Sequence, residues 1–139
     1  MKKSGFAVFA IFLALLAVSA HAQLVVIAHP GVEGNAISKA SLSKVFTGAS
    51  SRLGSGAHVV PVLLKEGNTH NRFLSEYLGK SPIALLLVWR GLVLSGQAAM
   101  PKSVESEEEM VKFVARTPNS IGYIDAKTPH AAVKEIQVE

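Results

Sequence analysis

The sequence contains no cysteine, and aromatic residues make up only 6% of its 139 residues. Without cysteine the chain forms no disulfide, uses no thiol as a nucleophile and offers no thiolate to a metal. Charged residues are also few, at 17%, and the lysines and arginines are spread along the chain. A nucleic-acid-binding protein more often carries a concentrated basic face, so we do not expect nucleic acid as a partner.

The first 22 residues have the three parts of a secretory signal peptide. Lys2 and Lys3 form a basic start, an apolar stretch covers residues 6–18, and residues 20–22 are a small-x-small triplet of the kind that signal peptidase cleaves. The apolar stretch is shorter than the roughly 20 residues that a membrane-spanning helix needs. We therefore expect a periplasmic mature domain of residues 23–139 with no membrane anchor after cleavage. That domain keeps 12 Lys and Arg against 10 Asp and Glu, a formal charge of +2.

Apolar strands and amphipathic helices alternate along residues 23–139, which predicts one α/β domain. The predicted strands cover residues 23–28, 57–64, 121–124 and 133–138. The predicted helices cover residues 39–46, 69–78 with Asn68 as the N-cap, 83–94 and 107–114. The first strand is apolar without alternation, which indicates burial on both faces. Pro61 cannot donate to a ladder, so its strand is expected at an edge or with the proline facing an unpaired side.

The junction between the second strand and the helix that follows is the strongest candidate for a binding site. Gly67 bends the chain there, and the first turn of the helix is polar. Backbone N–H groups in such a turn lack intrahelical partners and lie at the positive end of the helix dipole, which suits an oxyanion. The candidate anion-binding residues are Gly67, Asn68, Thr69, His70, Asn71 and Arg72. The alternative is that Asn68 only caps the helix and the rest is a solvated first turn.

A second candidate follows the first strand, because open α/β sheets bind ligands at the carboxyl ends of strands. Asn35 and Ser38 supply hydrogen-bonding groups there; alternatively, Ser38 is a helix cap and Asn35 a turn residue. The histidines form no H-x-x-x-H pair, and the sequence has neither a nucleophile elbow nor a dinucleotide fingerprint. We therefore expect no metal, no cofactor and no catalytic residue, although a hydrolase built from distant side chains stays an open alternative.

The helix predicted over residues 83–94 carries Arg90 as its only charge. Two interpretations fit such an apolar helix. It is either a central helix of the core or an outer helix whose exposed apolar patch is covered by a partner.

Several segments resemble, in order, those of the phosphate-binding periplasmic proteins of ABC transporters, the PstS-like branch of the type II periplasmic binding proteins. They are residues 25–30, ISKASLSKVFTG at 37–48, the glycine-led helix that includes Phe73, and TPNSIGY at 117–123. The resemblance spans nearly all of the mature chain. It implies one lobe of such a protein, a single three-layer α/β domain in which helices flank a mixed, mostly parallel sheet.

The resemblance also implies a function, the binding of phosphate or a similar small oxyanion. A membrane permease, a sensor or a second copy of the chain is then the expected partner. Two features depart from the family: Gly67, Asn68 and Thr69 stand where Ser-Gly-Thr is typical, and residues 50–52 lack an expected tryptophan. One lobe offers donors on one face only, so we expect weak affinity. The competing hypothesis is a ligand-free protein-interaction or envelope accessory domain that keeps this fold.

Overall fold

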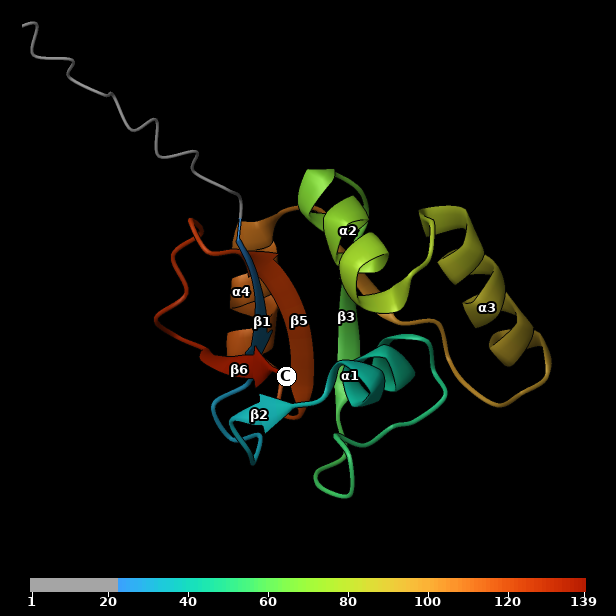
Figure 1. Ribbon diagram of the computed structural model, residues 1–139, viewed down its shortest axis with the longest axis horizontal. Helices are drawn as coiled ribbons and strands as arrows, with labels where there is room; N and C mark the ends of the chain where they lie inside the picture. The colour runs from blue at the N-terminus through green and yellow to red at the C-terminus, as the bar shows by residue number, and fades with distance from the viewer. Residues whose placement is uncertain (1–22) are drawn as a thin grey trace, which may run out of the picture.

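Residues 23–139, the part of the chain that the computed structural model describes, contain a six-stranded sheet with helices on both faces (Figure 1). The signal peptide expected over residues 1–22 lies outside the described residues. The strands are β1 (Leu24–Ala28), β2 (Ala36–Ile37), β3 (Val60–Leu64), β4 (Lys102–Val104), β5 (Ser120–Asp125) and β6 (Lys134–Val138). The helices are α1 (Lys39–Phe46), α2 (Asn68–Phe73), which continues as the π-helical turn η1 (Leu74–Leu78), α3 (Pro82–Leu94) and α4 (Glu107–Arg116).

The sheet is mixed and mostly parallel, as expected. Its strands lie in the order β2-β6-β1-β5-β3-β4. The pairs β2–β6, β3–β5 and β3–β4 are parallel, and β1 is antiparallel to both of its neighbours. The burial of three consecutive residues of β1, Val26, Ile27 and Ala28, confirms the prediction that this strand is covered on both faces.

Pro61 lies in an inner strand, and its ring nitrogen faces a side without a ladder partner. The N–H of the preceding residue, Val60, donates to the Asn119 carbonyl of the β5 side at 2.7 Å. Successive residues point their backbone groups to opposite sides of a strand, so the Pro61 nitrogen points toward β4. The pairing with β4 begins only at Val62, one residue later. The structure thus confirms the second of the two positions expected for this proline.

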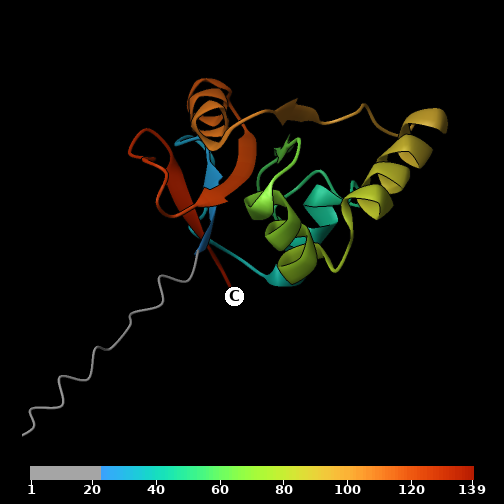
Figure 2. The ribbon, with the colours of Figure 1, turned by 90° about the horizontal axis from the view of Figure 1, so that it is seen from above.

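Helices cover the two faces of the sheet, which gives the expected three layers (Figure 2). On one face α4 packs so closely that a Cβ at Gly122 would lie 2.5 Å from the Met110 sulfur. On the other face Tyr123 stacks on Phe73 of α2 with ring centroids 3.8 Å apart. Phe46 of α1 meets the edge of the Phe73 ring at 4.9 Å. These three buried aromatic side chains join α1 and α2 to the centre of the sheet.

The α3 helix lies outside these layers, beside α1 and the end of η1 (Figure 2). Only Leu85 and Trp89 of this helix are buried, and the Trp89 indole N–H donates to the Phe46 carbonyl at 3.0 Å. Its outer face exposes Leu87 at 59% and Leu94 at 87%. The interpretation of this helix as a central core helix is therefore wrong. Its apolar composition does not show which of its faces is covered.

Within residues 23–139, no single helix is both long and apolar enough to cross a membrane. The segments Asn68–Leu78 and Pro82–Leu94 meet that requirement only when taken together, and they are bent by 71°.

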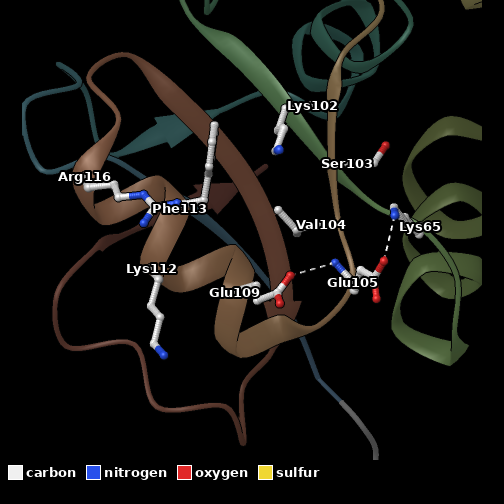
Figure 3. A pocket seen from close by; sticks show the side chains of 9 residues that line it. All are labelled: Lys65, Lys102, Ser103, Val104, Glu105, Glu109, Lys112, Phe113 and Arg116. Carbon is white, nitrogen blue, oxygen red and sulfur yellow. Dashed lines mark hydrogen bonds and ion pairs between the residues drawn. The ribbon is translucent and has the colours of Figure 1, made fainter.

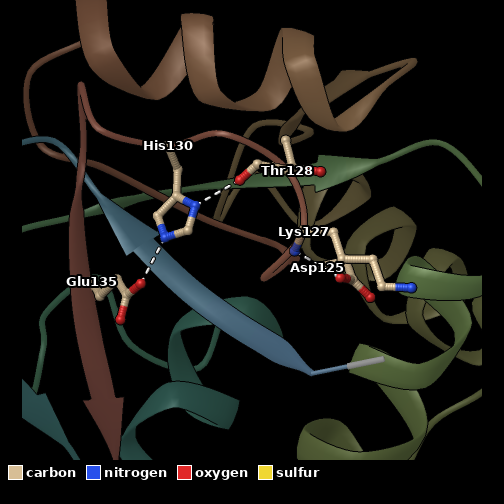
Figure 4. Close-up of polar contacts among 5 residues, drawn as sticks. All are labelled: Asp125, Lys127, Thr128, His130 and Glu135. Atoms are coloured by element: carbon tan, nitrogen blue, oxygen red, sulfur yellow. Dashed lines mark hydrogen bonds and ion pairs between the residues drawn. The ribbon is translucent and has the colours of Figure 1, made fainter. Parts of the chain in front are cut away.

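The connection between β5 and β6 holds a histidine between two acceptors (Figure 4). His130 Nδ1 lies 2.6 Å from the Thr128 carbonyl, and its Nε2 lies 2.6 Å from a Glu135 carboxylate oxygen. Both ring nitrogens are donors only when the imidazole is protonated. The hydrogen bond to Glu135 and then that to Thr128 therefore raise the pKa of His130 above its ordinary 6.5.

Replacing this histidine (His130→Gln) is expected to destabilise the protein more at about pH 5 than at about pH 8.5. A pKa raised by folding adds stability that is complete below the unfolded value and is lost as the pH rises through the folded value. The pair is partly exposed, so the effect stays below about 1 kcal/mol. Urea unfolding at both pH values measures it. Glu135→Gln removes the same pair from its other side and is expected to reproduce the pH dependence; equal losses by His130→Gln at both pH values would contradict the assignment.

Candidate anion-binding site

The start of α2 leaves three backbone donors without acceptors. Gly67 precedes the helix with a φ of +111°, which a residue with a side chain rarely adopts. The first amide with a helical acceptor is that of Asn71, which donates to the Gly67 carbonyl at 3.0 Å. The N–H groups of Asn68, Thr69 and His70 have no acceptor within residues 23–139. The feature on which the anion hypothesis depends, a set of free amides at this junction, is therefore present.

These amides lie beside a cavity of about 330 Å³ at the carboxyl end of β3. Its other wall is the start of α4, because the parallel pairing of β3 and β4 brings the two helix starts together. That wall is acidic. Four carboxylates line the cavity and none of its lining residues is a lysine or arginine; the carboxylates belong to Glu66, Glu105, Glu107 and Glu108. The electrostatic potential of the cavity thus opposes a fully deprotonated anion.

A lysine beside the cavity offsets only one of these four charges. Lys65 Nζ lies 2.7 Å from a Glu105 carboxylate oxygen, with both side chains exposed. Their hydrogen bond raises the pKa of Lys65 and lowers that of Glu105. The lysine and the carboxylate therefore neutralise each other at the edge of the cavity.

Glu107 accepts hydrogen bonds from groups near the cavity that could otherwise donate to a bound oxyanion. Its carboxylate accepts hydrogen bonds from the Thr69 hydroxyl at 3.1 Å, from the Thr128 hydroxyl at 3.2 Å and from the Asp125 N–H. One internal carboxylate therefore joins the start of α2 to the end of β5 and the turn after it. The acidic run at residues 105–109 is visible in the sequence, where it is typical of the start of the helix predicted over residues 107–114. Its position opposite α2 follows from the strand pairing.

Only part of the predicted 67–72 segment lines the cavity. Gly67, Asn68 and Thr69 do, whereas Asn71 is exposed without lining it. Arg72 forms an ion pair with Glu76 at 3.2 Å along the same helix.

The His70 side chain turns inward, and its Nδ1 lies 2.6 Å from the Tyr123 hydroxyl. Burial lowers the pKa of His70, so its imidazole is neutral at pH 7. As a neutral group it adds no positive charge near the cavity.

Asn35 and Ser38 lie at the opposite end of the sheet from Gly67. β1 runs antiparallel to β5 and β3 runs parallel to β5, so the carboxyl ends of β1 and β3 point in opposite directions. Ser38 caps α1 by accepting from the Ser41 N–H at 3.1 Å, and the Asn35 carbonyl accepts from the Gln137 N–H at 2.8 Å. The first bond confirms that Ser38 caps α1. The second joins the backbone at the start of β2 to β6 and does not involve the Asn35 side chain.

A basic cavity of about 460 Å³ lies on the outer side of β4 and α4 (Figure 3). Lys102 Nζ and Arg116 Cζ lie 5.9 and 5.8 Å from the centre of the Phe113 ring, and Lys112 is on the same helix. None of these three cations has a carboxylate within ion-pair distance in the described part of the chain. The sequence analysis missed this cluster because its members come from two elements.

The sequence matches no family model, and no curated protein matches it either. Several solved structures share its fold. A protein of Clostridium perfringens, assigned as a phosphate ABC transporter substrate-binding protein and solved with bound phosphate, matches 84% of this chain with a TM-score of 0.65 at 16% identity. The ABC-type phosphate transport receptor of Vibrio cholerae also matches 84%, with a TM-score of 0.63 at 14% identity. PstS of Borrelia burgdorferi matches 85%, with a TM-score of 0.60 at 16% identity.

The matches cover only 45%, 46% and 47% of those three chains, so this chain spans about half the length of each. At such low identities the likeness concerns the fold alone. The domain has the fold of one lobe of PstS-like phosphate-binding proteins.

Proposed function

We propose that this protein is an exported, non-enzymatic binding module of the periplasm, which binds hydrogen phosphate or a similar protonated oxyanion weakly at the start of α2. A role beside an ABC-type permease or a sensor fits this proposal. Its structural neighbours are described as phosphate-binding and phosphate-transport proteins, which supports the ligand class. The observation that carries the proposal is the set of unpaired N–H groups at Asn68, Thr69 and His70 beside a cavity of about 330 Å³.

The acidic wall of the cavity determines which oxyanion fits. Hydrogen phosphate carries a proton that can donate to a carboxylate, whereas sulfate at neutral pH has only acceptors. Glu66 and Glu108 are exposed on the cavity wall and accept no hydrogen bond from described residues. Contact with these two carboxylates therefore disfavours the binding of sulfate more than the binding of hydrogen phosphate. One face of donors and four nearby carboxylates keep the affinity low unless a permease, a sensor or a second copy closes the site.

Removal of one carboxylate is expected to strengthen phosphate binding. Glu66→Gln and Glu108→Gln each remove a like charge a few ångströms from the bound anion, and we expect the Kd for phosphate to fall about three- to tenfold. Isothermal titration at low ionic strength, on protein purified from the periplasm, measures the change. Glu33→Gln is the matched control, because Glu33 is exposed in the loop after β1, at the other end of the sheet.

The same titrations give the outcomes that would contradict the proposal. If folded protein gives no heat with millimolar phosphate, the anion site is refuted. If phosphate binds, but Arg116→Gln abolishes binding and the glutamate variants leave Kd unchanged, the anion occupies the basic cavity beside Phe113 and the start of α2 is not its site. Tighter binding of sulfate than of phosphate would contradict the role of the acidic wall.

Two observations favour the second candidate function, a ligand-free protein-interaction or envelope accessory domain. Glu107 already uses the Thr69 hydroxyl, and α3 exposes Ile83, Leu87 and Leu94 at 67%, 59% and 87%. A silent phosphate titration, combined with a partner captured from periplasmic extract, would favour this function.

A further inference from the structure

An apolar groove of about 320 Å³ lies between α3 and the segment that leads into β4. It is separate from the acidic cavity: of the residues that line the two, only Leu64 is shared. Most of its surface is apolar, and its volume is in the range of small-molecule sites. The residues that define it are Ile83, Leu86 and Trp89 on α3, Met100 and Pro101 opposite them, and His70.

One of the residues that line this groove has a polar side chain that is nearly buried. His70 is 5% exposed, and its Nδ1 lies 2.6 Å from the Tyr123 hydroxyl. That hydroxyl accepts the Leu64 N–H at 2.9 Å, so its own proton is directed to His70 Nδ1. In a neutral imidazole the remaining proton is then on Nε2.

The Nε2–H group of His70 has no hydrogen-bond partner among residues 23–139. Every fully enclosed side-chain nitrogen or oxygen in the described part of the chain has a partner, so Nε2 is not enclosed. His70 lines the apolar groove and none of the other cavities described above. The Nε2–H therefore opens onto the groove as a donor.

We infer that this groove binds a small apolar ligand with a carboxylate or carbonyl head, whose oxygen accepts the His70 Nε2–H while its hydrocarbon tail lies between α3 and Met100. A purely apolar ligand would displace water from Nε2–H without replacing its hydrogen bond. A cationic head would present a second donor to it. Ser103, which also lines the groove, adds a hydroxyl donor for an acceptor head, whereas the Lys65 ammonium at the groove is paired with Glu105.

Sodium octanoate is a suitable probe, with octylammonium as the amphiphile of equal length and opposite head charge. NMR titration of the protein purified from the periplasm is expected to show saturable octanoate binding that shifts the Nε2 and Hε1 resonances of His70. Octylammonium is expected to leave these resonances unchanged. Failure of octanoate to shift them, or an equal shift with octylammonium, would overturn the inference.

Two substitutions on one helix provide the matched test. Leu86→Trp fills the groove and is expected to weaken octanoate binding at least about tenfold. Leu87→Trp adds the same side chain to the outer face, where Leu87 is 59% exposed, and is expected to leave binding within about twofold. Equal effects of the two changes would overturn the inference, because they would indicate general adhesion to α3 or a protein-docking face. Phosphate titration of Leu86→Trp is expected to match the unaltered protein, which separates this site from the proposed anion site.

Discussion

Tyr123→Phe is expected to lower the free energy of unfolding by about 2–4 kcal/mol, because it leaves two buried groups without a hydrogen bond. β3 and β5 pair only at Val60 and Pro61, so the Leu64 N–H has no acceptor on the β5 backbone. The Tyr123 hydroxyl takes this place at 2.9 Å and also meets His70 Nδ1 at 2.6 Å. Burial raises the pKa of Tyr123 well above its ordinary range, so the phenol keeps the proton that it donates.

Tyr77→Phe is the matched control for this change. Tyr77 packs near Phe73 with ring centroids 5.5 Å apart, but its hydroxyl makes no hydrogen bond within the described residues. We expect Tyr77→Phe to change stability by less than about 0.5 kcal/mol. Chemical unfolding of both variants, followed by circular dichroism, measures the difference. If Tyr123→Phe is as mild as Tyr77→Phe, the hydroxyl is not the link between β3, β5 and α2.

The class of fold could be predicted from the sequence because burial leaves a local pattern. β1 has the unbroken apolar run of a strand covered on both faces, most helices have an apolar stripe, and Ser38, Ser81 and Ser106 precede their helices as caps. β2 and β4 were not predicted, since strands of two and three residues leave no readable period. The sequence also did not indicate which face of α3 is exposed, because nearly all side chains of this helix are apolar.

The candidate site could be predicted only where it depends on the local backbone. The free amides after Gly67 follow from a glycine bend before a helix, and the structure has them. Their acidic surroundings and the inward turn of His70 depend on α4 and β5, which are distant in sequence. Asn35 was a candidate because it follows the carboxyl end of the first strand, but the antiparallel β1–β5 pair directs that end away from the carboxyl end of β3. Strand direction is a property of the assembled sheet.

Gly48→Ala is expected to cost about 2–5 kcal/mol and to loosen α3 from the rest of the domain. Gly48 has a φ of +76°, which disfavours a side chain. A Cβ there would also lie 2.4 Å from a Leu92 methyl group and 3.1 Å from two atoms of the Trp89 ring. α3 would have to move, and the bond from the Trp89 indole to the Phe46 carbonyl would lengthen or break. The chain has one tryptophan, so its fluorescence is expected to shift to longer wavelength as Trp89 becomes exposed.

Gly79→Ala separates the backbone part of this cost from the contact with α3. Gly79 has a similar left-handed φ of +61°, yet a Cβ there would meet no atom within 4 Å. Its substitution is expected to cost only the backbone strain, about 1–2 kcal/mol, with unchanged tryptophan fluorescence. The additional loss of stability in Gly48→Ala, relative to Gly79→Ala, then measures how tightly α3 packs against the end of α1. It therefore also measures how firmly the α3 wall of the apolar groove is held in place. Equal losses and equal fluorescence in the two variants would show that Gly48 does not hold α3 in the position described.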